Sequence, residues 1–97
     1  MKNETVVTLI HPGKTAEEDE KTAVFAQIEP TGRDEFEAAG QNGMKAEYKL
    51  TVWDSEYDEQ PEVIVNGDRY TIYRTYGPRG DGKTELYIAD RVGNHGR

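Results

Sequence analysis

Residues 24–39 read VFAQIEPTGRDEFEAA, and this stretch decides how the chain is expected to fold. Its first part alternates, which places every second side chain on one face of a strand: Val24, Ala26 and Ile28. Pro30 ends that strand because proline has no backbone N–H to donate to a sheet. Thr31 and Asp34 then form a variant capping box, with acids in the first turn. The stretch predicts a strand that leads directly into a short helix over residues 32–39.

The remainder of the chain predicts further strands separated by turns. Stretches rich in β-branched or alternating residues cover 5–10, 45–53, 63–65, 68–76 and 83–90. Asn66-Gly67 is the preferred pair for a two-residue type I′ hairpin turn. We therefore expect a single, mainly β domain over residues 1–97: a small antiparallel β-barrel or sandwich of about six strands with one short inserted helix. A barrel is preferred because closure removes exposed sheet edges, and residues 92–97 are expected to be a flexible tail.

The aromatic residues divide between the two faces of these strands. Alternation places Tyr70, Ile72 and Tyr76 together on one face, and Tyr48, Tyr70 and Ile72 are the expected core residues. A second set falls on the opposite strand faces, where a core and a subunit interface remain alternative environments: Trp53, Tyr73 and Tyr87. Because aromatic residues are enriched where oligomers exclude water, this second set is the predicted interface.

Size and charge limit the classes of function. A chain of 97 residues without cysteine has a small core and no disulfide or thiolate metal site to stabilise it, which favours oligomerisation. The formal charge of −7 argues against a nucleic-acid clamp, since such proteins neutralise phosphates with basic residues. Residues 1–67 hold 15 acids and 6 bases, whereas residues 68–97 hold 4 acids and 6 bases. This asymmetry fits either acidic-to-basic packing around a ring or a solvated surface without a role. No apolar run is long enough for a membrane span or a signal peptide, so a soluble protein is expected.

The motifs that carry chemistry are incomplete. The only histidines are His11, which precedes a proline, and His95 near the end of the chain, and neither lies in a pattern for nucleophilic catalysis. Residues 54–58 hold alternating acids, as a calcium loop does, but the central glycine and the terminal glutamate are missing. Residues 77–83 resemble a phosphate loop but join two predicted strands. We therefore expect no enzymatic activity, no cofactor and no metal.

The order and spacing of two segments resemble the phage head-tail joining family, whose members are head-tail adaptors or connector stoppers. The first is a strand of the form V-x-A-x-I followed by a G-x-x-E helix start and alanine, and the second is a hairpin of the form V-x-x-G-x-x-Y-x-I. The matching positions are Val24, Ala26, Ile28, Gly32, Glu35, Ala38 or Ala39, then Val63 or Val65, Gly67, Tyr70 and Ile72. The resemblance covers most of residues 22–90.

This resemblance implies a structural protein of the virion, assembled in the host cytoplasm. Several copies would form a ring below the portal, extend the DNA channel, help to retain DNA and dock the tail. The implied partners are copies of itself, a portal or adaptor protein and a tail terminator or tail protein, while DNA passes through without specific binding. A loop near the axis would be either the joint from Gly40 to Gly43 or the acidic segment 54–62, in which the candidates are Asp54, Glu56, Asp58 and Glu59. Ring copy number and the choice between head-side stopper and tail-side terminator remain open.

Alternatives from other classes are also consistent with part of the sequence. A small acidic inhibitor or nucleic-acid mimic fits the size and charge, but its acids should form phosphate-like rows along rigid elements. Here most acids fall in two predicted loops, residues 17–20 and 54–62. A tail-terminator-type completion protein and a small protein-binding barrel are the remaining alternatives.

Overall fold

The computed structural model describes residues 3–31 and 44–91, which form six strands and two short 3-10 turns. The strands are β1 (Asn3–His11), β2 (Glu20–Pro30), β3 (Met44–Trp53), β4 (Glu62–Val65), β5 (Asp68–Tyr76) and β6 (Lys83–Arg91). The 3-10 turns are η1 (Ala16–Glu18) and η2 (Asp54–Glu56). Each predicted strand is present, with ends that differ by a few residues.

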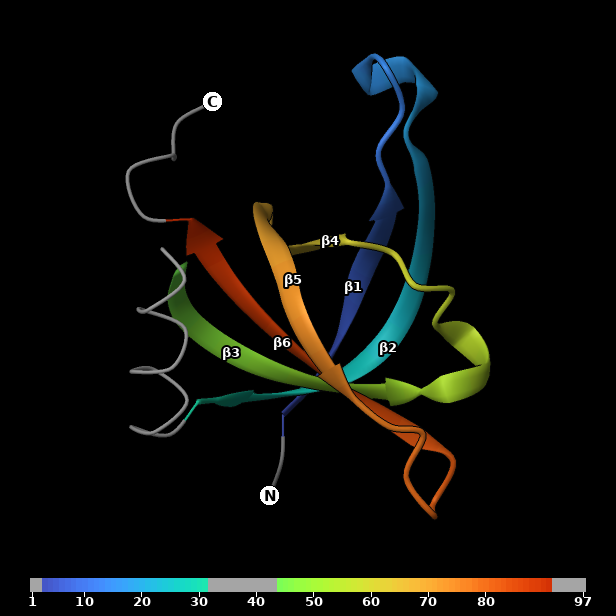
Figure 1. Cartoon of the computed structure of the whole chain (residues 1–97), viewed down its shortest axis with the longest axis vertical. Helices are drawn as coiled ribbons and strands as arrows, with labels where there is room; N and C mark the ends of the chain where they lie inside the picture. The colour runs from blue at the N-terminus through green and yellow to red at the C-terminus, as the bar shows by residue number, and fades with distance from the viewer. Residues whose placement is uncertain (1–2, 32–43, 92–97) are drawn as a thin grey trace.

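The six strands close into a barrel in the order β1-β2-β3-β6-β5-β4, with β4 returning to pair with β1 (Figure 1). Every neighbouring pair is antiparallel. The mainly β fold is therefore confirmed, and it is a barrel rather than a sandwich. The predicted helix over residues 32–39 and the predicted tail over residues 92–97 lie outside the described residues.

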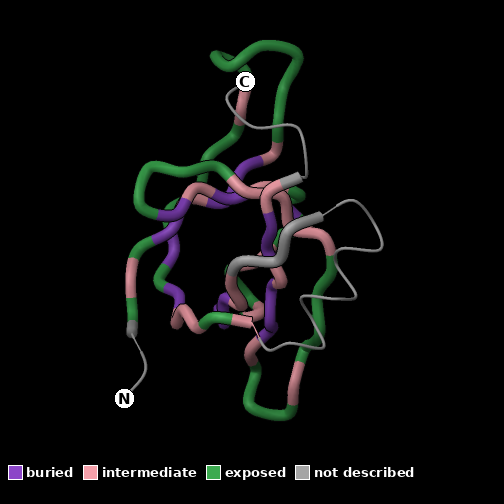
Figure 2. Tube along the Cα trace, turned by 90° about the vertical axis from the view of Figure 1, so that its left-hand side faces the viewer, coloured by how far each residue is buried: buried purple, intermediate pink, exposed green. Residues whose placement is uncertain are grey.

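Alternating residues on five strands are buried in the barrel interior, and Tyr70 and Ile72 of β5 pack against them. Figure 2 colours the buried stretches of the backbone purple. The core consists of Val7, Leu9, Val24, Ala26, Leu50, Val52, Val63, Val65, Leu86 and Ile88. Three larger side chains predicted for the core are partly buried and pack against it: Tyr48, Tyr70 and Ile72. Since closure already pairs the strands, burial of this aliphatic set is what excludes water from the interior.

The hairpin between β4 and β5 has the predicted geometry. Val65 pairs with Asp68, so the turn contains only Asn66 and Gly67. Both have positive φ, 52° and 87° respectively, as a type I′ turn requires. This turn fixes which side chains of the two strands face the core.

A bulge in β5 changes the predicted face of one aromatic residue. The pairing of β5 with β6 shifts between Ile72 and Arg74, so that Tyr76 lies opposite Glu85 on the outer surface and is 61% exposed. The placement of Tyr76 on the core-facing side was therefore wrong. The extra residue at a bulge reverses the alternation beyond it, and the sequence around Tyr73 carries no glycine or proline to signal it.

The connection from β5 to β6 is ordered by its own polar groups. The amide of Arg79 donates to the carbonyl of Lys83 at 2.8 Å, and the amide of Gly82 donates to the carbonyl of Arg79 at 3.0 Å. The Asp81 carboxylate accepts from the Lys83 amide at 3.1 Å. The glycines of this segment predict a flexible tip, and these bonds connect its backbone across the turn.

Candidate functional site

Three large apolar side chains form a row across the outside of the barrel. Val6 on β1 pairs directly with Phe25 on β2. Phe25 and Trp53 on β3 line the same hollow, just beyond Gln27 and Thr51, where the pairing of β2 with β3 ends. The exposed fractions are 53% for Val6, 69% for Phe25 and 51% for Trp53. These are three of the four large hydrophobic side chains that are exposed in the part of the chain that the structure describes.

Lys83 on β6 completes this row, because it pairs directly with Trp53. Its ammonium nitrogen lies 4.9 Å from the centre of the Trp53 ring, a cation–π contact. We call Val6, Phe25, Trp53 and Lys83 the aromatic row. A hollow of about 40 Å³ lies beside it, with Thr51 among its lining residues. On each strand the adjacent residue points into the barrel, so the alternation of side chains directs the members of the row to the outer surface.

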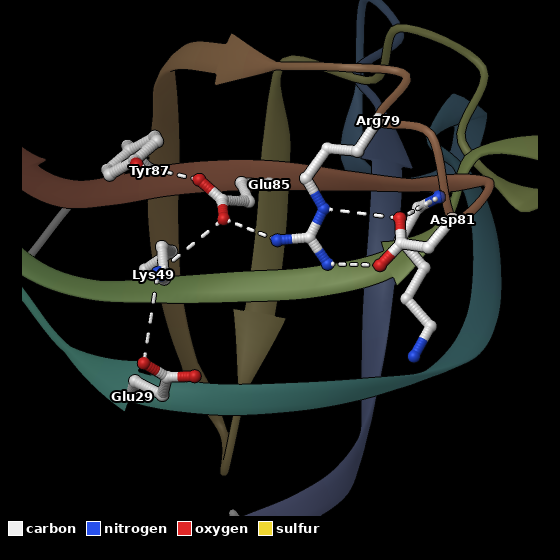
Figure 3. Close-up of polar contacts among 7 residues, drawn as sticks. Glu29, Lys49, Arg79, Asp81, Glu85 and Tyr87 are labelled. Atoms are coloured by element: carbon white, nitrogen blue, oxygen red, sulfur yellow. Dashed lines mark hydrogen bonds and ion pairs between the residues drawn. The ribbon is translucent and has the colours of Figure 1, made fainter.

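A ladder of opposite charges crosses the outer surface of the barrel (Figure 3). It lies beside the aromatic row, since Glu85 of the ladder is two residues along β6 from Lys83. The Lys49 ammonium lies 3.8 Å from a Glu29 carboxylate oxygen and 3.6 Å from Glu85 Oε2. Arg79 Nη1 donates to the same Glu85 oxygen at 2.7 Å, and Arg79 Nη2 donates to Asp81 Oδ2 at 2.8 Å. The ladder therefore connects β2, β3 and β6 to the β5–β6 tip.

The electrostatics of the ladder favour the ionised forms of Glu85 and Asp81. Burial alone would raise the pKa of Glu85, but the hydrogen bond from the Tyr87 hydroxyl and the charges of Lys49 and Arg79 together lower it. The hydrogen bond from Arg79 is the main cause of the lowered pKa of Asp81. The same bond is the main cause of the raised pKa of Arg79. Lys49 and Arg79 each pair with two carboxylates, and these ion pairs form a charged border beside the aromatic row.

The three predicted interface residues all lie on the outer surface but do not form one cluster. The rings of Tyr73 and Tyr87 are 6.4 Å apart, and the Arg74 guanidinium carbon lies 4.1 Å above the Tyr87 ring. Tyr87 pairs with Lys49, four residues along β3 from Trp53, a separation of about 13 Å at the usual rise of a strand. Trp53 therefore belongs to the aromatic row, and the two tyrosines belong to a separate group around Arg74.

The predicted acidic loop is tied to the barrel at its beginning. Asp54 starts η2, its amide donates to the carbonyl of Gly82 at 2.9 Å, and its carboxylate accepts from the Thr84 hydroxyl at 2.6 Å. Glu56 and Glu59 are exposed. Asp54 is thus an anchor of this loop, which leaves the outward-facing acids as the ones able to meet a partner.

The end of the same loop is held by a buried glutamine. Gln60 is 3% exposed, and its carbonyl accepts from the Tyr57 hydroxyl at 2.9 Å. Its side-chain oxygen accepts from the amide of Asp58 at 2.7 Å. Burial, with a smaller effect from the charge of Glu59, raises the pKa of Tyr57 to about 12. His11 Nε2 lies 2.9 Å from the Asp58 carbonyl oxygen, a further link from this loop to β1.

The other predicted loop residues, Gly40 and Gly43, lie outside the described residues. Within residues 3–31 and 44–91, no three histidine, cysteine, aspartate or glutamate side chains are grouped to hold a metal ion. The same part of the chain contains no helix long and apolar enough to cross a membrane.

Of the aromatic row, sequence reasoning identified only Trp53 and missed Val6, Phe25 and Lys83. Phe25 lies between the inward-facing Val24 and Ala26, so the alternation of β2 already required it to face outward. Val6 follows by the same argument from its pairing with Phe25, which only the barrel register reveals. The available signal in the sequence was an aromatic residue at an outward-facing position of a clearly alternating strand.

The chain matches no protein-family model and no curated protein.

Proposed function

We propose that this protein is a structural connector subunit of the phage head-tail joining type, which assembles into a ring below the portal and carries no catalytic activity. The observation that supports this most directly is the aromatic row on the outside of a closed barrel. A contiguous apolar surface bordered by polar residues is typical of protein–protein contact.

Closure of the barrel restricts how such subunits can associate. An open sheet can add a strand from a partner, whereas every strand of this barrel has two neighbours, with β4 pairing to residues 8–10 of β1 and β3 pairing to residues 27–30 of β2. Closure therefore favours association through side chains on the outer surface. The largest exposed ones gather where Phe25 and Trp53 lie side by side, and the border beside them carries both signs of charge. A ring needs such a surface to pack against a different patch of the next copy.

The charge distribution disfavours the nucleic-acid mimic. The outward-facing acids Glu17 and Glu18 lie in η1, and Glu56 lies in η2, which are short turns rather than long rigid elements. On the strands, Glu29 and Glu85 pair with basic residues and do not form an uninterrupted acidic row. A small barrel that contacts other proteins fits this surface better.

The proposal is tested by adding the purified protein to portal complexes and to DNA-filled phage heads that lack this component. We expect the protein to bind at the portal vertex and to restore tail attachment. Circular dichroism of the same sample monitors folding. A folded protein that binds neither complex over the whole accessible concentration range would refute the connector function.

A further inference from the structure

A pocket of about 290 Å³ lies at the end of the barrel where β2 ends and the β4–β5 turn begins. Its wall is built from apolar and aromatic side chains: Ile28, Tyr48, Val65 and Tyr70. The rings of Tyr48 and Tyr70 meet edge to face, with centres 6.3 Å apart and planes at 89°. The volume is just below the range of sites for drug-sized ligands and suits a group the size of one side chain.

The rim of this pocket is acidic. Glu29 and Asp68 are among its lining residues, and no lysine, arginine or histidine is among the described residues that line the pocket. Glu29 shares its charge with Lys49, whose nitrogen lies 3.8 Å away on the outer surface. Arg69, the cation next to Asp68 in sequence, pairs instead with Glu62 and Asp19. Asp68 is therefore the main source of negative charge that a ligand would meet.

We propose that this pocket binds one organic cation, a guanidinium or alkylammonium group carried by an arginine or lysine side chain of a partner or by a small amine. Both tyrosines line the pocket, and an aromatic ring attracts a cation, as in aromatic cages. A carboxylate at the rim adds direct electrostatic attraction. An anion would be repelled, and a neutral apolar ligand would remove water from Asp68 without compensating its charge.

The charge requirement can be tested on the unmodified protein by NMR titration with ethylguanidinium and with ethylurea, a neutral molecule of nearly the same shape. Ethylguanidinium should cause saturable shifts of the backbone amides of Val65, Asp68 and Tyr70. Ethylurea should bind at least about tenfold more weakly, since only the cation gains from the rings and the carboxylate. Equal binding of the two probes, or no saturable shift with either, would refute the proposal.

Two variants locate the site. Asp68→Asn should weaken ethylguanidinium about threefold, the scale expected for a partly exposed charge pair. Glu56→Gln removes an exposed carboxylate from η2 and should leave the affinity unchanged. Wild-type affinity in the D68N variant, or an equal loss in E56Q, would contradict the assignment. A capped Gly-Arg-Gly peptide distinguishes the sources: binding at least as tight as ethylguanidinium identifies a partner side chain, and binding by the free cation alone identifies a small amine.

Discussion

The ammonium group of Lys83 lies 4.9 Å from the centre of the Trp53 ring, and the two residues pair directly between β3 and β6. This contact holds a large exposed indole in one orientation on the barrel surface. A side chain that is already ordered loses less conformational entropy when it is buried by a partner. Trp53 and its neighbour Phe25 are therefore suited to act as preorganised anchors of the aromatic row.

The first prediction concerns this row. The double variant F25S/W53S should leave the barrel folded at a cost of about 1–3 kcal/mol, because both side chains are more than half exposed but Trp53 loses its contact with Lys83. It should lose binding to portal complexes and any concentration-dependent self-association in sedimentation. Tyr76→Ser is the matched control, since Tyr76 is 61% exposed but lies outside the row. Loss of binding only in the control would place the contact elsewhere.

Much of the fold was predictable because its signals are local. The alternation around Leu50 and the Asn66-Gly67 turn determine strand faces and one register, and both are present as expected. The bulge at Tyr73 was not predictable, since an uninterrupted alternation that places Tyr70, Ile72 and Tyr76 on one face fits the sequence equally well. The link from Arg79 to Glu85 depends on how the β5–β6 tip folds back, which residue spacing alone does not determine.

The second prediction tests the turn that sets the register. Gly67→Val should destabilise the protein by about 1 kcal/mol or more, because a β-branched residue is strained at a φ of 87°. A Cβ at Gly67 or at Gly80 would have no atom within 4 Å, so neither substitution creates a clash. Gly80→Val, at a position without positive φ, should be nearly neutral. Thermal and urea unfolding measure the difference, and equal destabilisation by both variants would contradict the explanation from backbone strain.

The third prediction concerns the anchor of the acidic loop. Thr84 is 2% exposed, and its hydroxyl donates to Asp54 at 2.6 Å. Thr84→Val keeps the shape of the side chain and should cost about 1 kcal/mol, the usual net contribution of a hydrogen bond. Hydrogen exchange should become faster at the amides of Asp54 and Tyr57. Thr75→Val makes the same chemical change at an exposed strand position and should not affect those amides.

The fourth prediction is a pH dependence that arises from Glu85. Its pKa is lowered in the folded protein, so its ionised form contributes stability above the ordinary value of 4.5. That contribution should disappear as the pH falls through the folded-state pKa. Urea unfolding of the wild type and of E85Q should differ most near neutral pH, and the two curves should converge in acid. Asp19 and Asp81 also have lowered pKa values but are present in both proteins, so the difference isolates Glu85. A gap that does not change with pH would exclude Glu85 as its source.

The last prediction is that the isolated protein does not bind duplex DNA at about 0.15 M salt, even if DNA passes through the assembled ring. Its formal charge is −7, and Lys49, Arg69 and Arg79 are already paired with carboxylates. They therefore cannot replace the counterions of a phosphate backbone, which is the main source of non-specific affinity. Fluorescence anisotropy with a labelled duplex measures this, and saturable micromolar binding would contradict it.

A charge reversal extends this test to the assembled particle. Glu56 and Glu59 are exposed on the acidic loop, so the E56K/E59K variant should fold normally. If the loop faces the channel, its acids repel the phosphates only within about 8 Å of the wall and keep the duplex free to slide. The lysine variant should then slow DNA ejection, whereas E56Q/E59Q, which removes charge without reversing it, should have a smaller effect. Virions of the lysine variant that assemble normally and eject DNA at the wild-type rate would show that these acids do not face the DNA.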